Sequence, residues 1–159
     1  MVRDLMVHEG KIAPAFCKAA AACATGMGVV IDRAAKTFAL PEAATADNIY
    51  VVHKERIPTG VYAGIADLSD YFEESNTVAA DEFAPLWMYE FGEEFAVDAY
   101  NTTNVTAEAA GQYLAVGTDG KWDIAASGVA SKYRLVGLYD DAGHALARIE
   151  VMDATGTNS

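Results

Sequence analysis

The sequence predicts a mainly β protein, namely a small antiparallel β-barrel or sandwich with an extended N-terminal arm and at most one short helix. Short runs rich in β-branched and aromatic residues recur along the chain. In the last third, apolar and polar residues alternate with a period of two. Turn signals containing glycine or proline separate these runs. No long helical pattern lies between the strands, which argues against a βαβ arrangement.

The length of 159 residues, with 52% hydrophobic and 21% charged residues, suits one globular domain. We expect an N-terminal arm or first strand over residues 1–25, a single β domain over 26–153 and a flexible tail over 154–159. Residues 1–11 are polar and lack a pattern, which is typical of an arm outside the core. The alanine-rich segment 13–25 suits either a helix or a closely packed strand, and its structure stays open.

In the first half, the expected elements follow from β-branched runs and turn residues. Residues 28–40 contain two such runs around a polar four-residue link, which predicts a hairpin. A strand is expected over 48–53. Leu68, Tyr71 and Phe72 have i, i+3, i+4 spacing, which predicts one or two helical turns. Residues 85–91 predict a short aromatic strand.

In the last third, the alternation is clearest. Residues 94–100 predict a half-buried strand, with Phe95 and Val97 on its inner face. Residues 112–122 predict a hairpin whose Asp119–Gly120 dipeptide suits a type I′ turn. A second hairpin is expected over 133–151, with its turn at 140–143. Because turn chemistry and strand pattern agree in both hairpins, this part of the prediction is internally consistent.

The charge is negative and unevenly distributed. The formal net charge is −12 and the isoelectric point about 4.4, which argues against binding to nucleic acid or to an anionic membrane. Residues 57–120, the acidic block, contain twelve acidic residues and no lysine or arginine. This block predicts either a solvated acidic face or a face that fits a basic partner.

No arrangement of residues indicates catalysis. His8, His53 and His144 lie in unrelated contexts, and no G-x-S-x-G motif is present. Cys17 and Cys23 lie in an alanine-rich run, which favours small buried thiols over a nucleophile or a zinc site. The glycines show no phosphate-binding pattern. The sequence therefore predicts a protein that is not an enzyme, with no cofactor and no metal.

Five segments carry a resemblance to a known family: GMGVVIDRAAKTFALP (26–41), IYVVHKERIPTG (49–60), VDAYNTT (97–103), GQYLAVGTDGKWDIA (111–125) and SKYRLVGLYDDAGHALARIEVM (131–152). In their order and character they resemble small virion proteins of tailed bacteriophages, and more narrowly capsid decoration (cement) proteins. The resemblance covers about residues 26–152 and rests on strand and hairpin patterns rather than on catalytic motifs.

The resemblance implies a β-barrel-like domain that binds the outside of an icosahedral head. Its partners would be the major capsid protein and further copies of itself, with a trimer as the expected form. The protein would be made in the cytoplasm of the bacterial host and lie on the capsid exterior. Two alternatives stay open: another virion component, such as a head–tail or tail protein, and a ligand-binding β-barrel. Copy number per particle separates the first alternative from decoration.

The contacting surface is expected in the N-terminal arm or in the acidic block. Aromatic side chains provide much contact area at low entropic cost, so exposed ones would serve as interface anchors. The candidate interface residues are Arg3, Leu5 and Met6 in the arm, and Phe72, Phe83 and Trp87 in the block.

Overall fold

The structure, a computed structural model, describes residues 1–7, 11–12, 17–54 and 76–159. Within these residues the chain is mainly β, and the one helical element is the 3₁₀ turn η3 (Ala107–Ala109). This confirms the predicted mainly β fold with at most one short helix. The helical turns expected near Phe72 fall outside the described residues.

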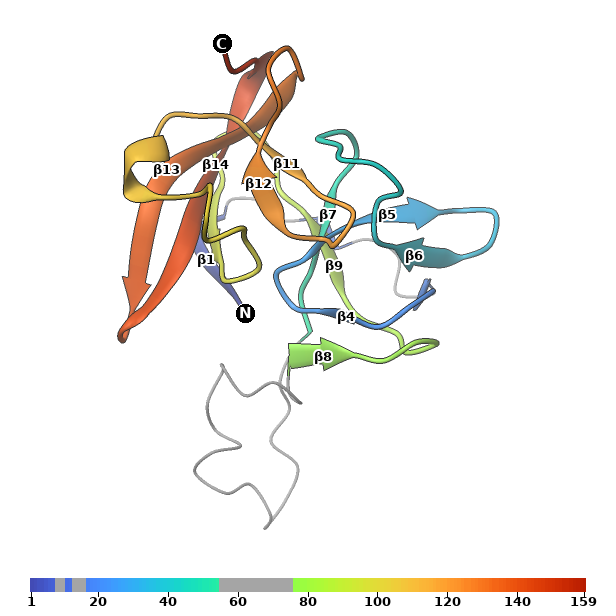
Figure 1. The fold of residues 1–159 in the computed structure, drawn as a ribbon. Coiled ribbons are helices and arrows are strands. Elements are labelled where there is room, and N and C mark those ends of the chain that lie inside the picture. The colour runs from blue at the N-terminus through green and yellow to red at the C-terminus, as the bar shows by residue number, and fades with distance from the viewer. Residues whose placement is uncertain (8–10, 13–16, 55–75) are drawn as a thin grey trace.

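A four-stranded antiparallel sheet forms one side of the molecule. Its order is β1-β10-β14-β13, so β1 and β13 are its edges. Figure 1 shows the long β13–β14 hairpin along this side. The strands are β1 (Val2–Met6), β10 (Glu94–Val97), β13 (Ser131–Asp141) and β14 (His144–Gly156).

A six-stranded sheet forms the other side, in the order β2-β9-β7-β5-β6-β3. All its pairs are antiparallel except β3 with β6. Two further pairs, β4 with β8 and β11 with β12, complete the described strands. The strands are β2 (Lys11–Ile12), β3 (Lys18–Ala19), β4 (Cys23–Ala24), β5 (Gly28–Asp32), β6 (Thr37–Ala39), β7 (Tyr50–Val52), β8 (Thr77–Val78), β9 (Leu86–Met88), β11 (Leu114–Val116) and β12 (Trp122–Ile124).

The buried hydrophobic side chains form two clusters, and strands β5, β7 and β9 lie between them. Successive residues of a strand point to opposite faces, so a strand covered on both sides needs apolar residues in succession. This explains the unbroken runs Val29-Val30, Val51-Val52 and Leu86-Trp87. Val29, Val52 and Leu86 belong to the cluster with Phe38, whereas Val30, Val51 and Trp87 pack in the cluster around Trp122.

Trp122 lies at the centre of the larger cluster and is completely buried. Its ring contacts Phe95 and Tyr133 edge-on, at centroid distances of 5.6 and 4.9 Å. Its indole N–H donates to the carbonyl of Gly26 at 3.2 Å, which satisfies the one polar group of the ring. This contact joins the β11–β12 hairpin to the segment before β5.

The N-terminal segment is extended but is not an arm. β1 pairs with β10 from Val2↔Val97 onward, and Met1 and Val2 are only 5% and 7% exposed. The α-amino group donates to the Thr25 carbonyl at 2.8 Å and to the Asp98 carboxylate at 2.6 Å. Of the two alternatives expected for the start of the chain, an arm or a first strand, the structure has a first strand, β1, over Val2–Met6. The apolar Val2 and the partly buried ion pair between the α-amino group and Asp98 provide the reason.

The C-terminal residues are also held in place. β14 continues to Gly156. The side-chain amide of Asn158 donates to the carbonyls of Tyr113 and Ala125 at 2.9 and 2.8 Å, and its oxygen accepts from the Tyr113 N–H at 2.8 Å. Strand β14 thus extends into the segment 154–159 that was expected as a flexible tail, and Asn158 satisfies backbone groups next to β11 and β12.

Both predicted C-terminal hairpins are present, but their turns differ from expectation. In the β11–β12 hairpin only Gly120 has a positive φ, 77°, and the Gly117 N–H donates to the Lys121 carbonyl at 2.9 Å. The type I′ turn predicted there is wrong, because such a turn needs positive φ at both central residues. The β13–β14 hairpin has this property instead, with φ of 55° at Ala142 and 90° at Gly143.

Candidate interaction surface

The edge strand β1 carries three of the predicted interface residues. Its side chains alternate between partly and more fully exposed positions after the buried Val2. Met6 is 46% exposed, whereas Leu5 is half-buried. Arg3 is held by Asp141 from the tip of the β13–β14 hairpin, with 2.8 Å between the guanidinium Nε and the carboxylate. Of the three, Met6 therefore presents the most apolar surface.

Asp4 attaches β1 to the six-stranded sheet. The Tyr89 hydroxyl, just after β9, donates to one Asp4 oxygen at 2.5 Å. The His53 Nε2, just after β7, lies 3.3 Å from the other oxygen. The His53 ring in turn stacks on Trp87, with 4.7 Å between centroids and 18° between planes. Strand β1 is thus connected to Trp87 through His53.

The electrostatics of this cluster favour a charged Asp4 and a neutral Tyr89. Burial opposes ionisation of Asp4, but hydrogen bonds from His53 and Tyr89 outweigh it and lower the pKa of Asp4. Burial, and then the neighbouring Asp4, raise the pKa of Tyr89 well above its usual value. The Nδ1 atom of His53 is buried and has no hydrogen-bond partner among the described residues.

The remaining predicted residues are distributed differently. Trp87 is half-buried beneath His53 and packs on the larger cluster, so it supports the surface more than it exposes one. Phe83 is 51% exposed and lies at the other cluster, where it bridges to Lys18 and the ammonium sits 5.4 Å from the ring centroid. Phe72 lies outside the described residues. The structure therefore connects Arg3, Leu5, Met6 and Trp87, and places Phe83 apart from them.

Phe91 is an exposed aromatic residue that lies in a turn and not in the strand predicted over 85–91. It is 65% exposed, in the turn that joins β9 to β10. Glu93 is buried and accepts the Glu90 N–H at 2.7 Å, and Gly92 has a φ of 83°. Gly92 with its flanking acids is the signal that predicts this turn. Because Met6 pairs with Glu94, Phe91 and Met6 lie near the same end of the sheet.

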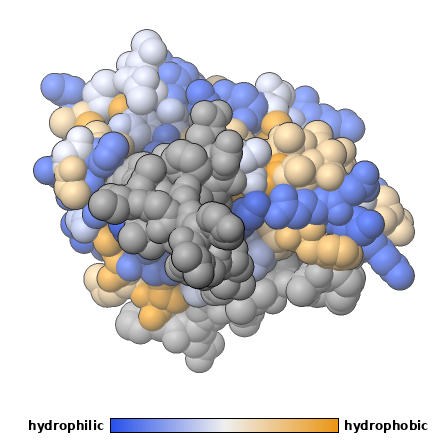
Figure 2. All heavy atoms as spheres, turned by 90° about the horizontal axis from the view of Figure 1, so that it is seen from below, coloured by the Kyte–Doolittle hydropathy of each residue, from blue (hydrophilic) through white to orange (hydrophobic). Residues whose placement is uncertain are grey.

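The acidic block is partly neutralised by cations from outside it. Lys54 pairs with Glu82 at 2.8 Å, Arg148 pairs with Glu94 at 2.5 Å and the α-amino group pairs with Asp98. These acids therefore form ion pairs within the molecule. They belong neither to a solvated acidic face nor to a face for a basic partner, the two interpretations of the block. Figure 2 shows the molecule from below, where hydrophobic residues form separate patches divided by hydrophilic ones over the coloured part of that face.

Within the described residues, the two cysteines, which are the other candidates for chemistry, have the environment of buried structural side chains. Cys17 and Cys23 are free and buried, as predicted for small buried thiols. Burial, followed by the nearby Glu82, raises the pKa of the Cys23 thiol to about 11, so the thiolate is disfavoured. Across the described ranges we find no group of three metal-ligating side chains and no helix of the length and apolarity needed to cross a membrane.

The geometry thus gives a firmly attached edge strand with apolar side chains exposed near one end. Met6 and Phe91 carry that apolar surface, and the Asp4 cluster holds the strand beneath it. We compared the chain with family models, with curated proteins and with solved structures, and none of the three comparisons found a significant match.

Proposed function

We propose that this chain is a structural virion protein that binds the outer surface of an icosahedral phage head and stabilises the capsid shell. The sequence resemblance over residues 26–152 motivates the proposal. Its supporting observation in the structure is the exposure of Met6 and Phe91 near one end of a sheet that is otherwise well packed. Exposed large apolar side chains on a rigid support are typical of interaction sites.

The proposed contact uses Met6 and Phe91 as apolar anchors. Complete burial of a side chain of this size contributes about 1.5–3 kcal/mol. The backbone edge of β1 offers further hydrogen-bonding groups beside them. Phe83, in a separate region, would contact a second subunit of the major capsid protein or another copy of this chain. A trimer around a local symmetry axis would place both regions on the shell.

The mechanism is mass action. A protein that binds assembled subunits more tightly than free ones lowers the free energy of the shell for each copy bound. The negative charge of the chain suits a position outside the shell, away from packaged DNA. On this proposal the protein is made in the cytoplasm of the bacterial host and joins the capsid exterior.

Particles prepared with and without this protein test the proposal. Under heating or low-salt stress, particles that lack it should release DNA at a lower temperature than particles that carry it. The copy number in purified particles is counted in parallel. Decoration by a trimer requires copies at all equivalent local symmetry axes of the shell, with three copies at each axis. A single ring of copies at one vertex would favour a head–tail or tail component, and equal stability of both particles would exclude stabilisation.

Paired variants test the contact surface. Met6→Ser with Phe91→Ser should reduce the number of copies bound per particle, because both apolar anchors are lost. The thermal midpoint of the free protein should change little, since both side chains are exposed. Leu138→Ser is the matched control, because Leu138 is 42% exposed on the opposite edge strand. An equal loss of binding with Leu138→Ser would show that the contact lies elsewhere.

A further inference from the structure

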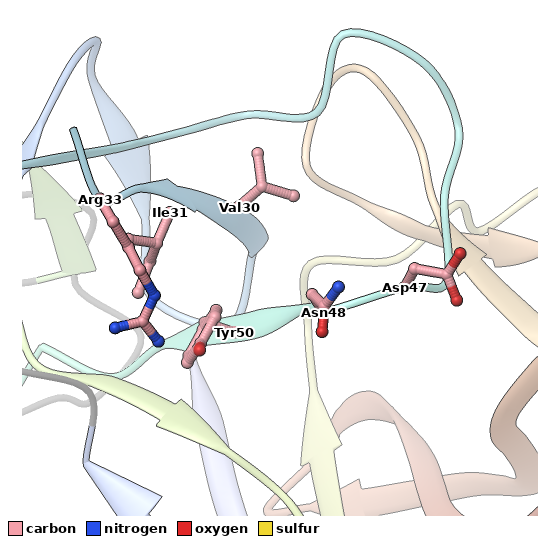
Figure 3. Close-up of a pocket in the computed structure, with 6 residues that line it drawn as sticks. All are labelled: Val30, Ile31, Arg33, Asp47, Asn48 and Tyr50. Atoms are coloured by element: carbon pink, nitrogen blue, oxygen red, sulfur yellow. The ribbon is translucent and has the colours of Figure 1, made fainter. Parts of the chain in front are cut away.

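A pocket of about 440 Å³ lies beside the start of β7, and Figure 3 shows the residues that line it. Its volume falls within the range of small-molecule sites, about 300–1,000 Å³. Two apolar residues come from β5, one cation from the turn after β5, two polar residues from the segment before β7, and one aromatic ring from β7 itself. The lining residues are Val30, Ile31, Arg33, Asp47, Asn48 and Tyr50.

The polar side chains of this pocket are not bonded to other side chains of the described residues. Among the described residues the structure records no side-chain hydrogen bond or ion pair for Arg33, Asp47, Asn48 or Tyr50. In contrast, Arg148, which is also partly exposed, is paired with a carboxylate. Four polar groups that line one hollow, without recorded bonds to each other, are available to a ligand.

The segment before β7 is held rigidly although it carries the exposed Asp47 and Asn48. The Thr45 backbone forms two hydrogen bonds with Val116, of 3.0 and 2.7 Å. The Thr45 hydroxyl accepts the Asp47 N–H at 3.1 Å. Asn48 has a φ of 53°, and the next residue, Ile49, is 1% exposed. A ligand would therefore meet side chains that are already positioned, which lowers the entropic cost of binding.

The charges of the pocket favour a neutral ligand. Arg33 and Asp47 carry opposite charges, so the site has no net attraction for an ion. The net charge of −12 further disfavours anions. Figure 3 shows Arg33 beside Tyr50, with Asn48 between Tyr50 and Asp47. The pocket thus offers donors at one end, acceptors at the other and an amide with both functions between them.

The same pocket also has an apolar surface, against which the C–H groups of a ligand ring can pack. The Tyr50 ring and Ile31 are half-buried, lie on the same face of the sheet and form this surface, whereas Val30 lies on the other face, at the rim of the pocket. A sugar ring has apolar C–H faces and vicinal hydroxyls that both donate and accept hydrogen bonds, and it carries no charge. We propose that this pocket binds one neutral hexose-type saccharide unit, with Tyr50 against its C–H face and Asn48 and Asp47 on its hydroxyls.

Titration of the isotope-labelled chain with glucose, galactose, mannose and N-acetylglucosamine, followed by NMR, tests the proposal. At least one of these sugars should cause saturable shifts of the backbone amides of residues 30–33 and 45–50, with a dissociation constant in the millimolar range. Asn48→Gly removes the amide and tolerates the positive φ at this position. It should weaken binding by about tenfold, as expected for one lost hydrogen bond of about 1.4 kcal/mol.

Arg33→Ala is the second variant, because Arg33 is exposed and its loss should leave folding intact. Glu42→Gln is the control, since Glu42 is exposed and outside the pocket. Arg33→Ala should weaken binding and Glu42→Gln should not. Absence of saturable shifts with all four sugars, shifts located elsewhere, or unchanged affinity in Asn48→Gly would overturn the proposal. So would stronger pocket binding of glycine betaine, a zwitterion, than of any sugar.

Discussion

At the scale of single residues, Asp4 controls how the first strand is attached. It accepts a hydrogen bond from a buried tyrosine and lies beside a histidine from a second strand. A hydrogen bond to a charged acceptor is stronger than one between neutral groups, with a contribution of about 1.5–3 kcal/mol. Because the Asp4 side chain is 31% exposed, the lower end of that range applies. This one carboxylate thereby ties β1 to the ends of β7 and β9.

Tyr89→Phe should destabilise the protein by about 1.5 kcal/mol, because it removes the hydroxyl that donates to Asp4. The pKa of Asp4 is lower in the folded protein than its usual value of 3.8. The contribution of its hydrogen bonds is therefore fully present above that pH and is lost as the pH falls further. The difference in unfolding free energy between wild type and variant should shrink below that pH, as measured by chemical denaturation.

Tyr100→Phe provides the comparison for this experiment. The Tyr100 hydroxyl donates to a neutral acceptor, the Ala145 carbonyl, at 3.3 Å. Its loss should produce a smaller destabilisation that does not follow the titration of a carboxyl group. If both variants lost the same stability at every pH, the Tyr89–Asp4 bond would not carry the pH dependence.

Gly28→Ala should destabilise the fold by about 1–3 kcal/mol. A Cβ at this position would lie 2.4 Å from a methyl group of Val116, because β5 packs directly against β11. Guanidinium denaturation measures the effect. In a Val116→Ala background the same substitution should cost less, since the clashing methyl groups are gone. Equal costs in both backgrounds would mean that the effect of Gly28 does not come from this contact.

At the scale of elements, the β13–β14 hairpin contains a strained turn. Ala142 adopts the left-handed conformation that type I′ turns require, and this conformation costs a residue with a Cβ about 1 kcal/mol or more. The long pairing from Asp141↔His144 to Tyr133↔Val151 compensates for that cost. The strain is therefore local to the tip.

Ala142→Asn should stabilise the protein, because asparagine tolerates the left-handed conformation better than alanine. We expect a gain of about 0.5–1 kcal/mol, which raises the thermal midpoint by about 1–4 °C in a chain of this size. Gly143→Ala, at a φ of 90°, should lower the midpoint. A lower midpoint for Ala142→Asn would contradict the assignment of this turn.

Elements with dense β-branched or aromatic content could be predicted from the sequence, and elements defined by distant partners could not. The hairpin β5–β6, strand β7 and hairpin β11–β12 appear where their patterns place them, although their ends differ from the predicted bounds. β3 and β4 contain two residues each and exist because of pairing with β6 and β8. Local propensity carries no signal for such contacts.

The candidate surface was predictable to a similar extent. Met6 and Phe83 are exposed, as an interface requires. Trp87 is half-buried because His53 stacks on it, and the sequence has no local sign of that contact. The aromatic residues at 85–91 predict a strand that includes Phe91, whereas Gly92 places Phe91 in a turn. A partner distant in sequence thus determines the burial of Trp87, whereas a local glycine determines the position of Phe91.

At the scale of the whole molecule, the net charge of −12 should make stability depend on salt. Like charges repel across the surface, and salt screens this repulsion. The thermal midpoint should rise as ionic strength increases from about 0.01 to about 0.15 M, because the Debye length falls from about 30 to about 8 Å. Neutralising two exposed acids, by Glu42→Gln with Asp153→Asn, should reduce this rise. A midpoint that falls with salt would show that ion pairs such as Lys54–Glu82 dominate.

The pairing of β1 with β10 also has a kinetic consequence. Val2 pairs with Val97, so the first strand cannot reach its place until most of the chain has been synthesised. Proteins dominated by such distant pairings fold slowly, over milliseconds to seconds. Until β1 docks, the open edge of β10 can pair with the β1 of a second molecule. Strand β1 thus waits for a distant partner, and high concentrations during refolding should favour strand-exchanged dimers.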